Sequence, residues 1–409
     1  MKILVVTQYF YPESFKINDL VQQMQKRGHE VCVLTGLPNY PEGRIYQGYS
    51  YWKSRAENYY GAKVIRSALI PRGKGGGLRL FINYISFAVS ASLEALCRVK
   101  GKFDVVFVYQ LSPITLAIPA LVVKRIGKTP IVMWIQDLWP ESAIDAGNAR
   151  LKSVKSVLNA LVQMIYDRTD HLLLSSRGFR QSIRSFGVPD NKMSYMPNWA
   201  EDFYEPCSRR DSFCHDDLIP DGFKVVFAGN IGEAQDFPAI IDAAEKLRKV
   251  KDIKWIILGN GRCREWARNE VVTRGLTDTV CFLGRFDLET MPLFFCRADA
   301  MLVALKKSSI FSLTVPAKLQ TYMACGRPIL TMLDGEGSKI VEDARAGLVC
   351  GAGDSDQLAK NVLEMFNMPV YEREEMGANA LAYYTKHFDR EKILGELDRV
   401  LHKVVGEYK

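Results

Sequence analysis

Short runs of apolar residues recur along the chain, and the segments between them carry apolar positions at helical spacing. Continuous apolar runs are typical of parallel strands that are buried on both faces of a sheet. Strands are predicted in the first half at 2–7, 31–35, 63–67, 104–109, 130–135 and 171–175. A helix between the first two should end at Gly28, because glycine readily adopts the left-handed C-cap conformation. This alternation predicts a parallel sheet covered by helices on both faces.

The same alternation starts again after a polar stretch at 198–221 that shows little periodicity. A second series of strands is predicted at 225–227, 255–258, 280–283, 300–304, 328–331 and 348–350. The tail is amphipathic and should be helical. The pattern therefore predicts an α/β protein with two doubly wound domains, at 1–200 and 201–385, followed by a C-terminal helix at 386–409.

The size and composition of the chain agree with two folded domains. A length of 409 residues exceeds what one hydrophobic core usually supports. The formal net charge of +8 suggests an anionic partner, and nucleic acid, phosphates and anionic lipid all satisfy it. Nucleic acid is disfavoured, because no recognition helix or interleaving of aromatic and basic residues is recognisable.

Three features lead us to expect a cytoplasmic protein. Met1 and Lys2 run directly into the first predicted strand, so no signal peptide is expected. No membrane span is expected, because the most apolar segment, 80–96, is interrupted by polar residues such as Asn83 and Glu94. The nine cysteines are scattered without metal-ligand spacing, and we interpret them as reduced thiols.

The stretch 315–330 carries the clearest candidate for a binding site. Its residue order predicts a loop, a helix that begins just after Pro316 and ends at Gly326, and then a buried strand. This order would place Lys318 and free backbone N–H groups at a helix N-terminus, which is a ready anion site. The alternatives are an ordinary strand-helix unit and a solvated surface lysine.

The same stretch resembles the signature of the GT-B glycosyltransferases, in particular the large retaining family 4, in which this element holds the nucleotide-sugar donor. The resemblance covers nearly the whole chain. It extends to a branch of the family that assembles O-antigen, colanic acid and capsule and that includes L-fucosamine transferases. The similar segments are 3–13, 26–31, 134–141, 197–199, 227–235 and 258–261.

The resemblance implies a GT-B fold, with two Rossmann-like domains facing across a cleft and the C-terminal helix crossing back to the N-terminal domain. The N-terminal domain would bind the acceptor and the C-terminal domain the donor. The implied reaction moves a sugar, with retention of configuration, from a nucleotide-sugar to a polyprenyl-diphosphate-linked saccharide in bacterial surface polysaccharide biosynthesis. A UDP-linked donor carrying an N-acetylated amino or deoxy sugar is expected by analogy with aminosugar transferases of this branch. No metal or other cofactor is expected.

The chain departs from the family at one point. Many members carry two glutamates at positions that correspond here to Leu313 and Thr321, and the second glutamate binds the nucleotide ribose. Neither residue is acidic in this chain. A carboxylate contact to the ribose is therefore not expected, and Thr321 offers only a neutral hydrogen bond.

Donor binding is expected to involve Lys318 and turns that follow predicted strands. A lysine suits the charge that develops on a leaving diphosphate. Glycines in such turns let the backbone approach a phosphate closely, and an ordinary tight turn is the alternative for them. Simple exposure is the alternative for Arg262. The full set of donor candidates is Gly229, Asn230, Gly232, Gln235, Gly261, Arg262, Ser309, Phe311, Ser312, Lys318 and Thr321.

Asp137 and Glu141 follow a buried strand of the first domain and are the candidates for acceptor chemistry, together with Tyr11 and Glu13 as acceptor-binding residues. A carboxylate at the end of a strand can orient or deprotonate an acceptor hydroxyl, so Asp137 and Lys318 are the predicted catalytic residues. Capping of the following segment is the alternative for Asp137. His29 follows a helix C-terminus and is expected to be structural.

The segment 72–102 combines a basic, glycine-rich entry with apolar positions at helical spacing. This combination fits docking on the anionic inner face of the cytoplasmic membrane. It fits an ordinary core-facing helix beneath a loop equally well.

Two alternatives to a transferase follow from the sequence. One is a UDP-sugar epimerase on the same fold, which would need several acid and base groups around one sugar. The other is a non-catalytic sugar-nucleotide-binding partner of an assembly complex, which the missing glutamate pair supports.

Overall fold

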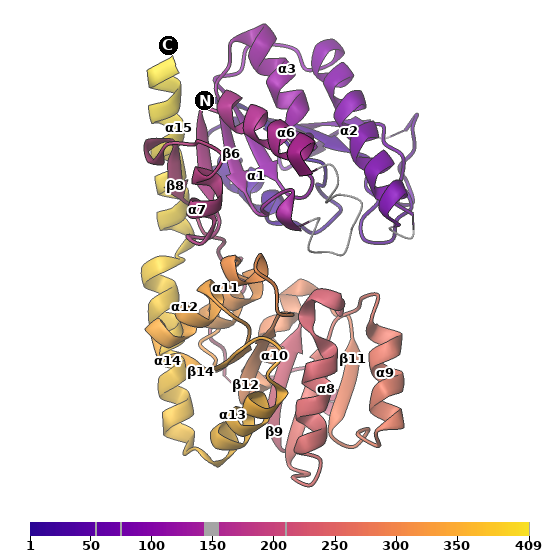
Figure 1. The fold of residues 1–409 in the computed structure, drawn as a ribbon, viewed down its shortest axis with the longest axis vertical. Helices are drawn as coiled ribbons and strands as arrows, with labels where there is room; N and C mark the ends of the chain where they lie inside the picture. The colour runs from indigo at the N-terminus through magenta and orange to yellow at the C-terminus, as the bar shows by residue number, and fades with distance from the viewer. Residues whose placement is uncertain (54, 74–75, 143–154, 209–210, 409) are drawn as a thin grey trace. The chain divides into compact units, whose positions relative to one another are not determined.

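The computed structural model describes every residue except 54, 74–75, 143–154, 209–210 and 409. The chain divides into two compact units. Unit 1 comprises Met1–Pro197 and Leu394–Lys409, and unit 2 comprises Asn198–Ile393. Each unit is built around its own sheet (Figure 1).

The strands of unit 1 form a sheet that winds in two directions from its centre. Their order is β3 (Ala56–Tyr59), β4 (Ala62–Ser67), β2 (Glu30–Gly36), β1 (Lys2–Val6), β5 (Val105–Gln110), β6 (Ile131–Ile135), β7 (His171–Leu174) and β8 (Met193–Tyr195). Among these strands only the β3–β4 pair is antiparallel. Because β1 pairs with both β2 and β5, the winding reverses at β1. Ligands bind outside the carboxyl ends of strands at such a switch point.

Helices surround this sheet. They are α1 (Lys16–Lys26), α2 (Gly77–Cys97), α3 (Ile118–Gly127), α6 (Lys155–Arg168) and α7 (Phe179–Arg184). The last helix of the chain, α15 (Arg390–Tyr408), joins unit 1 through Asp398, which accepts hydrogen bonds from Arg27 Nη1 at 3.0 Å and from His29 Nε2 at 3.1 Å. His29 also lies 3.3 Å from the amino group of Met1. It therefore ties three chain segments together, which agrees with the structural role expected for it.

Unit 2 repeats the same plan with a fully parallel sheet among the described strands. Their order is β11 (Val280–Gly284), β10 (Ile253–Leu258), β9 (Phe223–Ala228), β12 (Ala300–Ala304), β13 (Ile329–Met332) and β14 (Gly347–Cys350). The helices are α8 (Phe237–Lys246), α9 (Arg264–Thr273), α10 (Met291–Arg297), α11 (Ala317–Ala324), α12 (Glu336–Ala344), α13 (Ser355–Asn367) and α14 (Val370–His387). The switch point of this sheet lies between β9 and β12.

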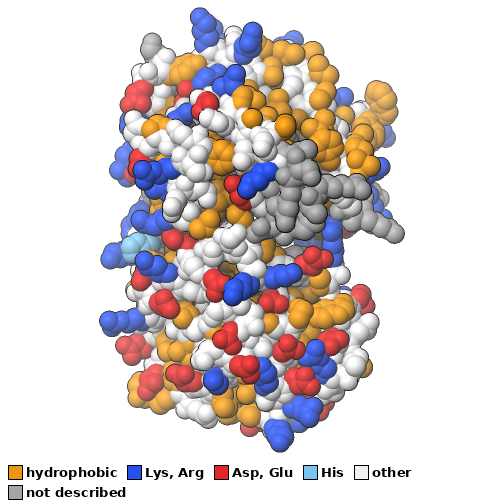
Figure 2. Space-filling view, viewed as in Figure 1, with side chains coloured by type: hydrophobic (Ala, Val, Ile, Leu, Met, Phe, Trp, Pro, Cys, Tyr) orange, Lys and Arg blue, Asp and Glu red, His pale blue; other side chains and the backbone are white. Residues whose placement is uncertain are grey.

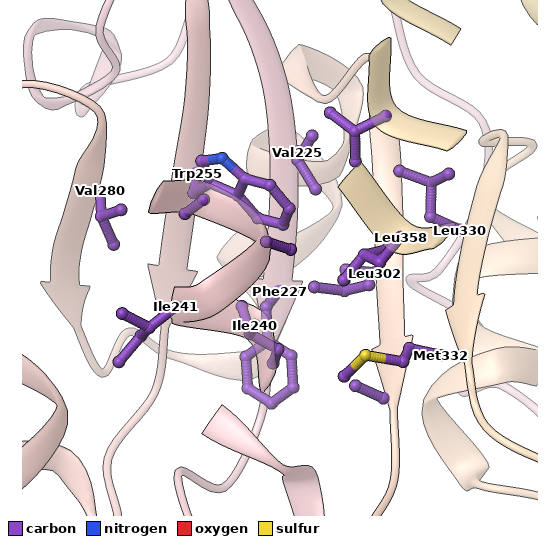
Figure 3. Packing of buried hydrophobic residues seen from close by; sticks show 14 of the residues in the cluster. Val225, Phe227, Ile240, Ile241, Trp255, Val280, Leu302, Leu330, Met332 and Leu358 are labelled. Atoms are coloured by element: carbon purple, nitrogen blue, oxygen red, sulfur yellow. The ribbon is translucent and has the colours of Figure 1, made fainter. Parts of the chain in front are cut away.

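Both faces of the unit 2 sheet are buried, because side chains alternate along each strand. Phe227 of β9 belongs to the core formed with α8, α9 and α13, whereas its neighbour Val226 belongs to the core formed with α10, α11, α12 and α14. Figure 3 shows the first of these cores, where Ile240 of α8 and Leu358 of α13 lie on the same side of the sheet as Phe227. The continuous apolar runs in the sequence predicted this two-sided burial.

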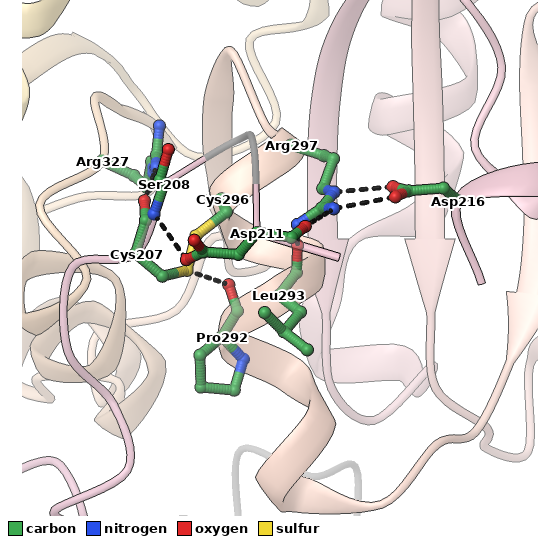
Figure 4. Close-up of a disulfide and its surroundings, with 9 residues drawn as sticks. All are labelled: Cys207, Ser208, Asp211, Asp216, Pro292, Leu293, Cys296, Arg297 and Arg327. Atoms are coloured by element: carbon green, nitrogen blue, oxygen red, sulfur yellow. Dashed lines mark hydrogen bonds and ion pairs between the residues drawn. A yellow bond between two sulfur atoms is a disulfide. The ribbon is translucent and has the colours of Figure 1, made fainter. Parts of the chain in front are cut away.

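The expectation that all nine cysteines are reduced thiols is wrong for one pair. Cys207, in the polar stretch before β9, is disulfide-bonded to Cys296 of α10, with Cα atoms 5.8 Å apart (Figure 4). Arg297 holds the same stretch through a two-pronged ion pair with Asp216, at 2.7 and 2.8 Å. Spacing along the sequence could not indicate the pairing, because the two cysteines are 89 residues apart and meet only in the folded unit.

Candidate active site

The helix predicted after Pro316 is present as α11, with Pro316 at its N-cap. Because α11 follows β12, its first turn lies at the switch point of the unit 2 sheet. Tyr322 fixes this placement, since its hydroxyl donates to Ala228 O at 3.0 Å and accepts from Ala228 N at 3.0 Å. Sequence reasoning missed Tyr322, although an aromatic residue inside the signature helix was an available signal.

Lys318 extends from the first turn of α11 to the end of β9. Its Nζ lies 3.8 Å from the centroid of the Phe227 ring, and a Cβ on Gly229 would come within 3.2 Å of it. The residue is partly exposed, but the Nζ atom is buried and has no hydrogen-bond partner among the described residues. Burial lowers the pKa of Lys318 to about 7. The alternative of a solvated surface lysine is therefore excluded, and the amine lacks the acceptor that a bound anion would supply.

Three glycines let the turns after β9 and β10 pack directly against each other. A Cβ on Gly259 would lie 1.9 Å from Gly229 O, and one on Gly261 would lie 2.2 Å from Ile231 O. The φ angle of Gly229 is +141° and that of Gly259 is +132°, a region that other residues rarely adopt. Packing between turns thus requires Gly259 and Gly261, whereas Gly229 also leaves room for the Lys318 amine.

Asn230, Gly232 and Gln235 form the turn that follows β9. Gln235 Oε1 accepts a hydrogen bond from Gly232 N at 3.2 Å, which closes the turn. A Cβ on Gly232 would lie 2.6 Å from Asn230 Nδ2, so the amide of Asn230 covers this glycine. Asn230 is exposed and Gln235 is half-buried. The turn therefore presents two amide side chains close to the carboxyl end of β9.

The loop before α11 satisfies much of its hydrogen bonding within itself. Ser312 Oγ donates to Ser309 O at 2.9 Å, and Ser312 N donates to Ser308 O at 3.1 Å. Phe311 begins a short 3-10 turn and is partly exposed. The loop is thus a compact element whose Phe311 ring and serines lie directly before the first turn of α11.

The two positions of the missing glutamate pair are uncharged in the structure as well. Thr321 Oγ1 donates to Ala317 O at 3.3 Å, one turn back in α11, so its hydroxyl is bonded to its own helix. Leu313 ends the 3-10 turn before α11. Neither residue can replace a carboxylate.

Arg264 is a residue of this region that sequence reasoning missed. Arg262, which was singled out, is exposed beside Gly261. Arg264 begins α9 directly after the same turn, and its Nε atom is buried without a hydrogen-bond partner among the described residues. A half-buried guanidinium at a helix start is the better anion candidate of the two.

In unit 1, Asp137 follows β6 and is partly buried. Ser142 Oγ donates to Asp137 Oδ2 at 2.9 Å. Burial raises the pKa of Asp137 to about 6, against the opposing effect of hydrogen bonds from Ser142 and Ser112, and the nearby Glu141 raises it further. A carboxyl group with this pKa can change protonation state near neutral pH. Asp137 also accepts a hydrogen bond from the backbone of Leu138.

Glu13 and Tyr11 lie in the turn that follows β1. Glu13 is fully buried, and its carboxylate accepts hydrogen bonds from Asn39 N at 2.8 Å and Tyr40 N at 2.6 Å. Burial raises the pKa of Glu13 to about 7, while those backbone hydrogen bonds oppose the shift. The Tyr11 side chain is 48% exposed, and its ring lies 5.1 Å from that of Tyr59. Glu13 is thus engaged with the protein backbone, whereas Tyr11 is accessible to a ligand.

The sequence contains an Asp-x-Asp triplet, Asp354-Ser355-Asp356, which the expectation of no metal did not take into account. Asp354 caps α13 by accepting a hydrogen bond from Gln357 N at 2.9 Å. Asp356 forms an ion pair with Lys246 at 2.7 Å. Both carboxylates therefore have structural roles at the start of a helix.

Helix α2 is packed against unit 1 on one side and exposed on the other. On the packed side, Asn83 accepts from Gln8 Nε2 at 2.8 Å and donates to Ile70 O at 2.7 Å, while Glu94 pairs with Arg55. The other side carries exposed apolar residues at helical spacing, namely Leu78, Phe81, Ile85, Val89, Leu93 and Leu96. Figure 2 shows hydrophobic side chains gathered over the part of unit 1 that carries α2 and α3. We call these six residues the α2 apolar face.

The expectation that no segment qualifies as a membrane span needs correction. By length and composition α2 qualifies, with 21 residues, a mean hydropathy of 1.5 in its most apolar window and 28% of that window buried. Core helices of soluble proteins pass the same test, so composition alone does not establish a span. The core-facing alternative holds for only one side of α2. Lys74 and Gly75, in the basic entry to this helix, lie outside the described residues.

Family models of known proteins match a segment in each of the two units. Residues 16–199 match the family model described as glycosyl transferase 4-like domain, and residues 222–368 match the model described as glycosyl transferases group 1. The chain is 26% identical over 339 residues, covering 80% of this chain and 82% of the relative, to a protein of Escherichia coli K12, WcaI, that is named as a glycosyl transferase of colanic acid biosynthesis. It is 26% identical over 246 residues, covering 57% of this chain and 59% of the relative, to a protein of Pseudomonas aeruginosa named as a probable glycosyltransferase, WbjE.

Solved structures share the fold. HepE of Anabaena, in complex with UDP, matches with a TM-score of 0.73 at 14% identity, over 98% of this chain and 100% of that chain. Sucrose-phosphate synthase of Thermosynechococcus elongatus matches with a TM-score of 0.77 at 13% identity, over 99% of both chains.

The two-unit fold and both family matches define the class of this protein as a glycosyltransferase with the GT-B fold, which confirms the predicted fold and enzyme class. More particularly, the chain joins a glycosyl transferase 4-like domain to a group 1 glycosyl transferase domain and is a hexosyltransferase-type enzyme.

Proposed function

We propose that this enzyme transfers a sugar from a nucleoside diphosphate sugar to a lipid-linked saccharide during assembly of a bacterial surface polysaccharide. The observation that carries the donor part is the buried amine of Lys318 at the switch point of unit 2, which has no hydrogen-bond partner among the described residues. The relative of Escherichia coli that is named for colanic acid biosynthesis supports the polysaccharide context. The UDP complexes of HepE support UDP as the nucleotide. The sugar is proposed to be an N-acetylated amino or deoxy sugar, as in the L-fucosamine branch.

In this proposal Lys318 stabilises the diphosphate as the bond between it and the sugar breaks. Lys318 lies in the first turn of α11, where the positive end of the helix dipole favours an anion. Developing negative charge then meets a positive amine in a site that excludes water, where such interactions are strong. Asn230 and Gln235 are proposed to hydrogen-bond the donor, and Arg264 to contact its phosphates or nucleobase. No metal is needed for this role.

Asp137 is proposed to orient the acceptor hydroxyl. The acceptor oxygen forms the new bond to the anomeric carbon on the face that the diphosphate leaves, and the hydroxyl proton passes to the departing phosphate oxygen, so configuration is retained. Glu141 and Tyr11 are proposed to line the acceptor site of unit 1, with Glu13 holding the turn that carries Tyr11. The family matches favour an active transferase over the non-catalytic and epimerase alternatives, although the missing glutamate pair fits the non-catalytic one.

A panel of nucleotides tests the donor proposal. UDP should raise the melting temperature of the purified protein by several degrees, because a ligand that binds only the folded state stabilises it by mass action. GDP, ADP and TDP serve as matched controls in the same thermal-shift measurement. A rise with GDP alone would replace UDP in the proposal, and no rise with any nucleotide would contradict the donor site.

The enzyme is further proposed to act at the inner face of the cytoplasmic membrane, with the α2 apolar face in contact with lipid. Lys100 and Lys102 lie exposed just after the helix, where they complement anionic headgroups. The packed face of α2, with Asn83 and Glu94 bonded to the rest of unit 1, keeps the helix in the plane of the membrane surface.

The double variant Phe81→Ser and Val89→Ser should reduce binding to phosphatidylglycerol vesicles by about tenfold or more, since each change removes an exposed apolar side chain from the lipid contact. Val272→Ser in α9 is the matched control, because Val272 is 65% exposed in unit 2. Co-sedimentation with vesicles measures the effect. Equal binding of the double variant and the wild type would remove α2 from the membrane contact.

A further inference from the structure

Arg72 has no charged partner among the residues that the structure describes. It lies between β4 and α2, and its guanidinium carbon lies 4.9 Å from the centroid of the Tyr40 ring. The residue is half-buried, its Nε atom is buried, and its side chain makes no hydrogen bond or ion pair with any residue that the structure describes. A guanidinium carries five N–H donors and remains charged in proteins. Leaving such a group partly buried and unpaired is costly, so its position calls for an anion.

The surroundings of Arg72 hold it in place and add further donors. Its backbone N donates to Asn39 Oδ1 at 3.2 Å. Tyr9 and Tyr84 lie close enough for the positive charge of Arg72 to lower their pKa values, although burial raises both overall. The phenol groups therefore remain protonated near neutral pH and can donate hydrogen bonds. A half-buried guanidinium with phenol groups in its electrostatic neighbourhood suits the oxygens of a phosphate.

The chain segment that carries Arg72 is fixed to the N-terminal half of α2. Ile70 N donates to Ser86 Oγ at 2.9 Å, and Arg79 Nε donates to Pro71 O at 2.9 Å. The two residues that precede Arg72 are thus bonded to the N-terminal half of the helix. The same half of α2 carries the first residues of the α2 apolar face, of which Leu78 is 72% exposed. An anion site therefore adjoins an apolar surface.

We propose that Arg72, with Tyr9 and Tyr84, binds the phosphate of a membrane-embedded lipid, and that this lipid is the acceptor of the enzyme. The inference rests on the proposed function and names the part of the acceptor that unit 1 recognises. A phosphate at Arg72 joined to an apolar chain along α2 accounts for both features. Tyr84 interacts electrostatically with both Arg72 and Asp137, so the phosphate site and the proposed catalytic carboxylate share a neighbour.

The test uses the full chain and vesicles of phosphatidylcholine, with or without undecaprenyl diphosphate. Wild-type protein should bind the doped vesicles about tenfold more tightly than the undoped ones, as expected for a charge-assisted contact. Arg72→Gln should lose this gain, and Arg72→Lys should regain part of it. Lys26→Gln is the matched control, an exposed basic residue at the end of α1 in the same unit, and should keep the gain.

Three outcomes would overturn the proposal. One is an unchanged gain in Arg72→Gln. Another is an equal loss on phosphatidylglycerol vesicles, which would indicate general attraction to anionic membranes. The third is complete competition by soluble pyrophosphate at concentrations comparable with the lipid, which would indicate a site for free phosphate. The nucleotide thermal shift, measured on the same variants, reports on unit 2, so failure of the donor proposal is distinguishable from failure at Arg72.

Discussion

Replacing Lys318 by methionine should make the protein more stable and at the same time markedly less active. The Lys318 amine is buried against Phe227 without a described hydrogen-bond acceptor, and burial lowers its pKa from the usual 10.5 to about 7. The unfolded chain therefore holds this proton more tightly than the folded one, which opposes folding at neutral pH. Each unit of such a shift corresponds to about 1.4 kcal/mol. We expect the free energy of unfolding at pH 7 to rise by at least about 1.4 kcal/mol, as measured by urea titration.

The pH dependence distinguishes this cause from a simple gain in packing. Between pH 7 and pH 10.5 the unfolded state binds more protons at Lys318, so the stability of the wild type rises with pH in that window. Lys318→Met lacks this rise, and the two proteins should converge in stability toward pH 10.5. A variant that is less stable than the wild type at pH 7 would contradict the buried, unpaired amine.

The same variant should transfer sugar at least about tenfold more slowly, because the diphosphate loses about 1.4 kcal/mol or more of transition-state stabilisation. Lys307→Met is the matched control, an exposed lysine of the same unit that should change neither stability nor rate appreciably. Initial rates with saturating nucleotide-sugar measure the loss. Unchanged rates in Lys318→Met would exclude Lys318 from the mechanism.

Replacing Asp137 by asparagine should slow transfer by about a hundredfold while leaving nucleotide affinity nearly intact. Asparagine keeps the shape and part of the hydrogen bonding to Ser142, but it lacks the charge that orients the acceptor hydroxyl. Asp137 belongs to unit 1, whereas the donor candidates all lie in unit 2. The rate constant at saturating donor and the dissociation constant of UDP together measure the two effects. Asp167→Asn, an exposed carboxylate on α6, is the control.

The dependence of the transfer rate on pH provides a second test of the role of Asp137. Because burial raises its pKa to about 6, the carboxylate is lost by protonation as the pH falls below that value. The rate of the wild type should therefore fall on the acid side of pH 6, and this fall should be absent in Asp137→Asn. A large loss of UDP affinity in the variant would instead place Asp137 at the donor.

Most strands and the signature helix could be predicted from the sequence because their signals are local. The run from Ile3 to Val6 and the run from Val225 to Ala228 in β9 are continuous apolar segments, which only two-sided burial explains. The helix after Pro316 followed from its cap and from the glycine at its end. Strands β3 and β8 escaped prediction because they are short, at 4 and 3 residues, and lie at the sheet edges where the apolar pattern is weak.

The candidate site was only partly predictable. Lys318 and Asp137 were identified by their positions after strands, but nothing local to either residue shows that its environment is dry enough to shift its pKa. Arg72 and Arg264 were not singled out as anion sites, because a lysine or arginine with no partner looks the same in a sequence as one with a partner. The pair of Cys207 and Cys296 was missed because the two residues are 89 positions apart and meet only in the folded unit.

The sequence by itself thus determined the class of fold, the tandem arrangement and the position of the signature helix, because hydrophobic periodicity and caps act over a few residues. Only the tertiary structure decided which side chains are left buried without partners and which face of α2 stays exposed. Those properties depend on residues far apart in the chain, such as Phe227 beside Lys318 and Tyr40 beside Arg72. Burial and pairing arise when distant strands and helices pack together, so the chemistry of the site appears only in the folded units.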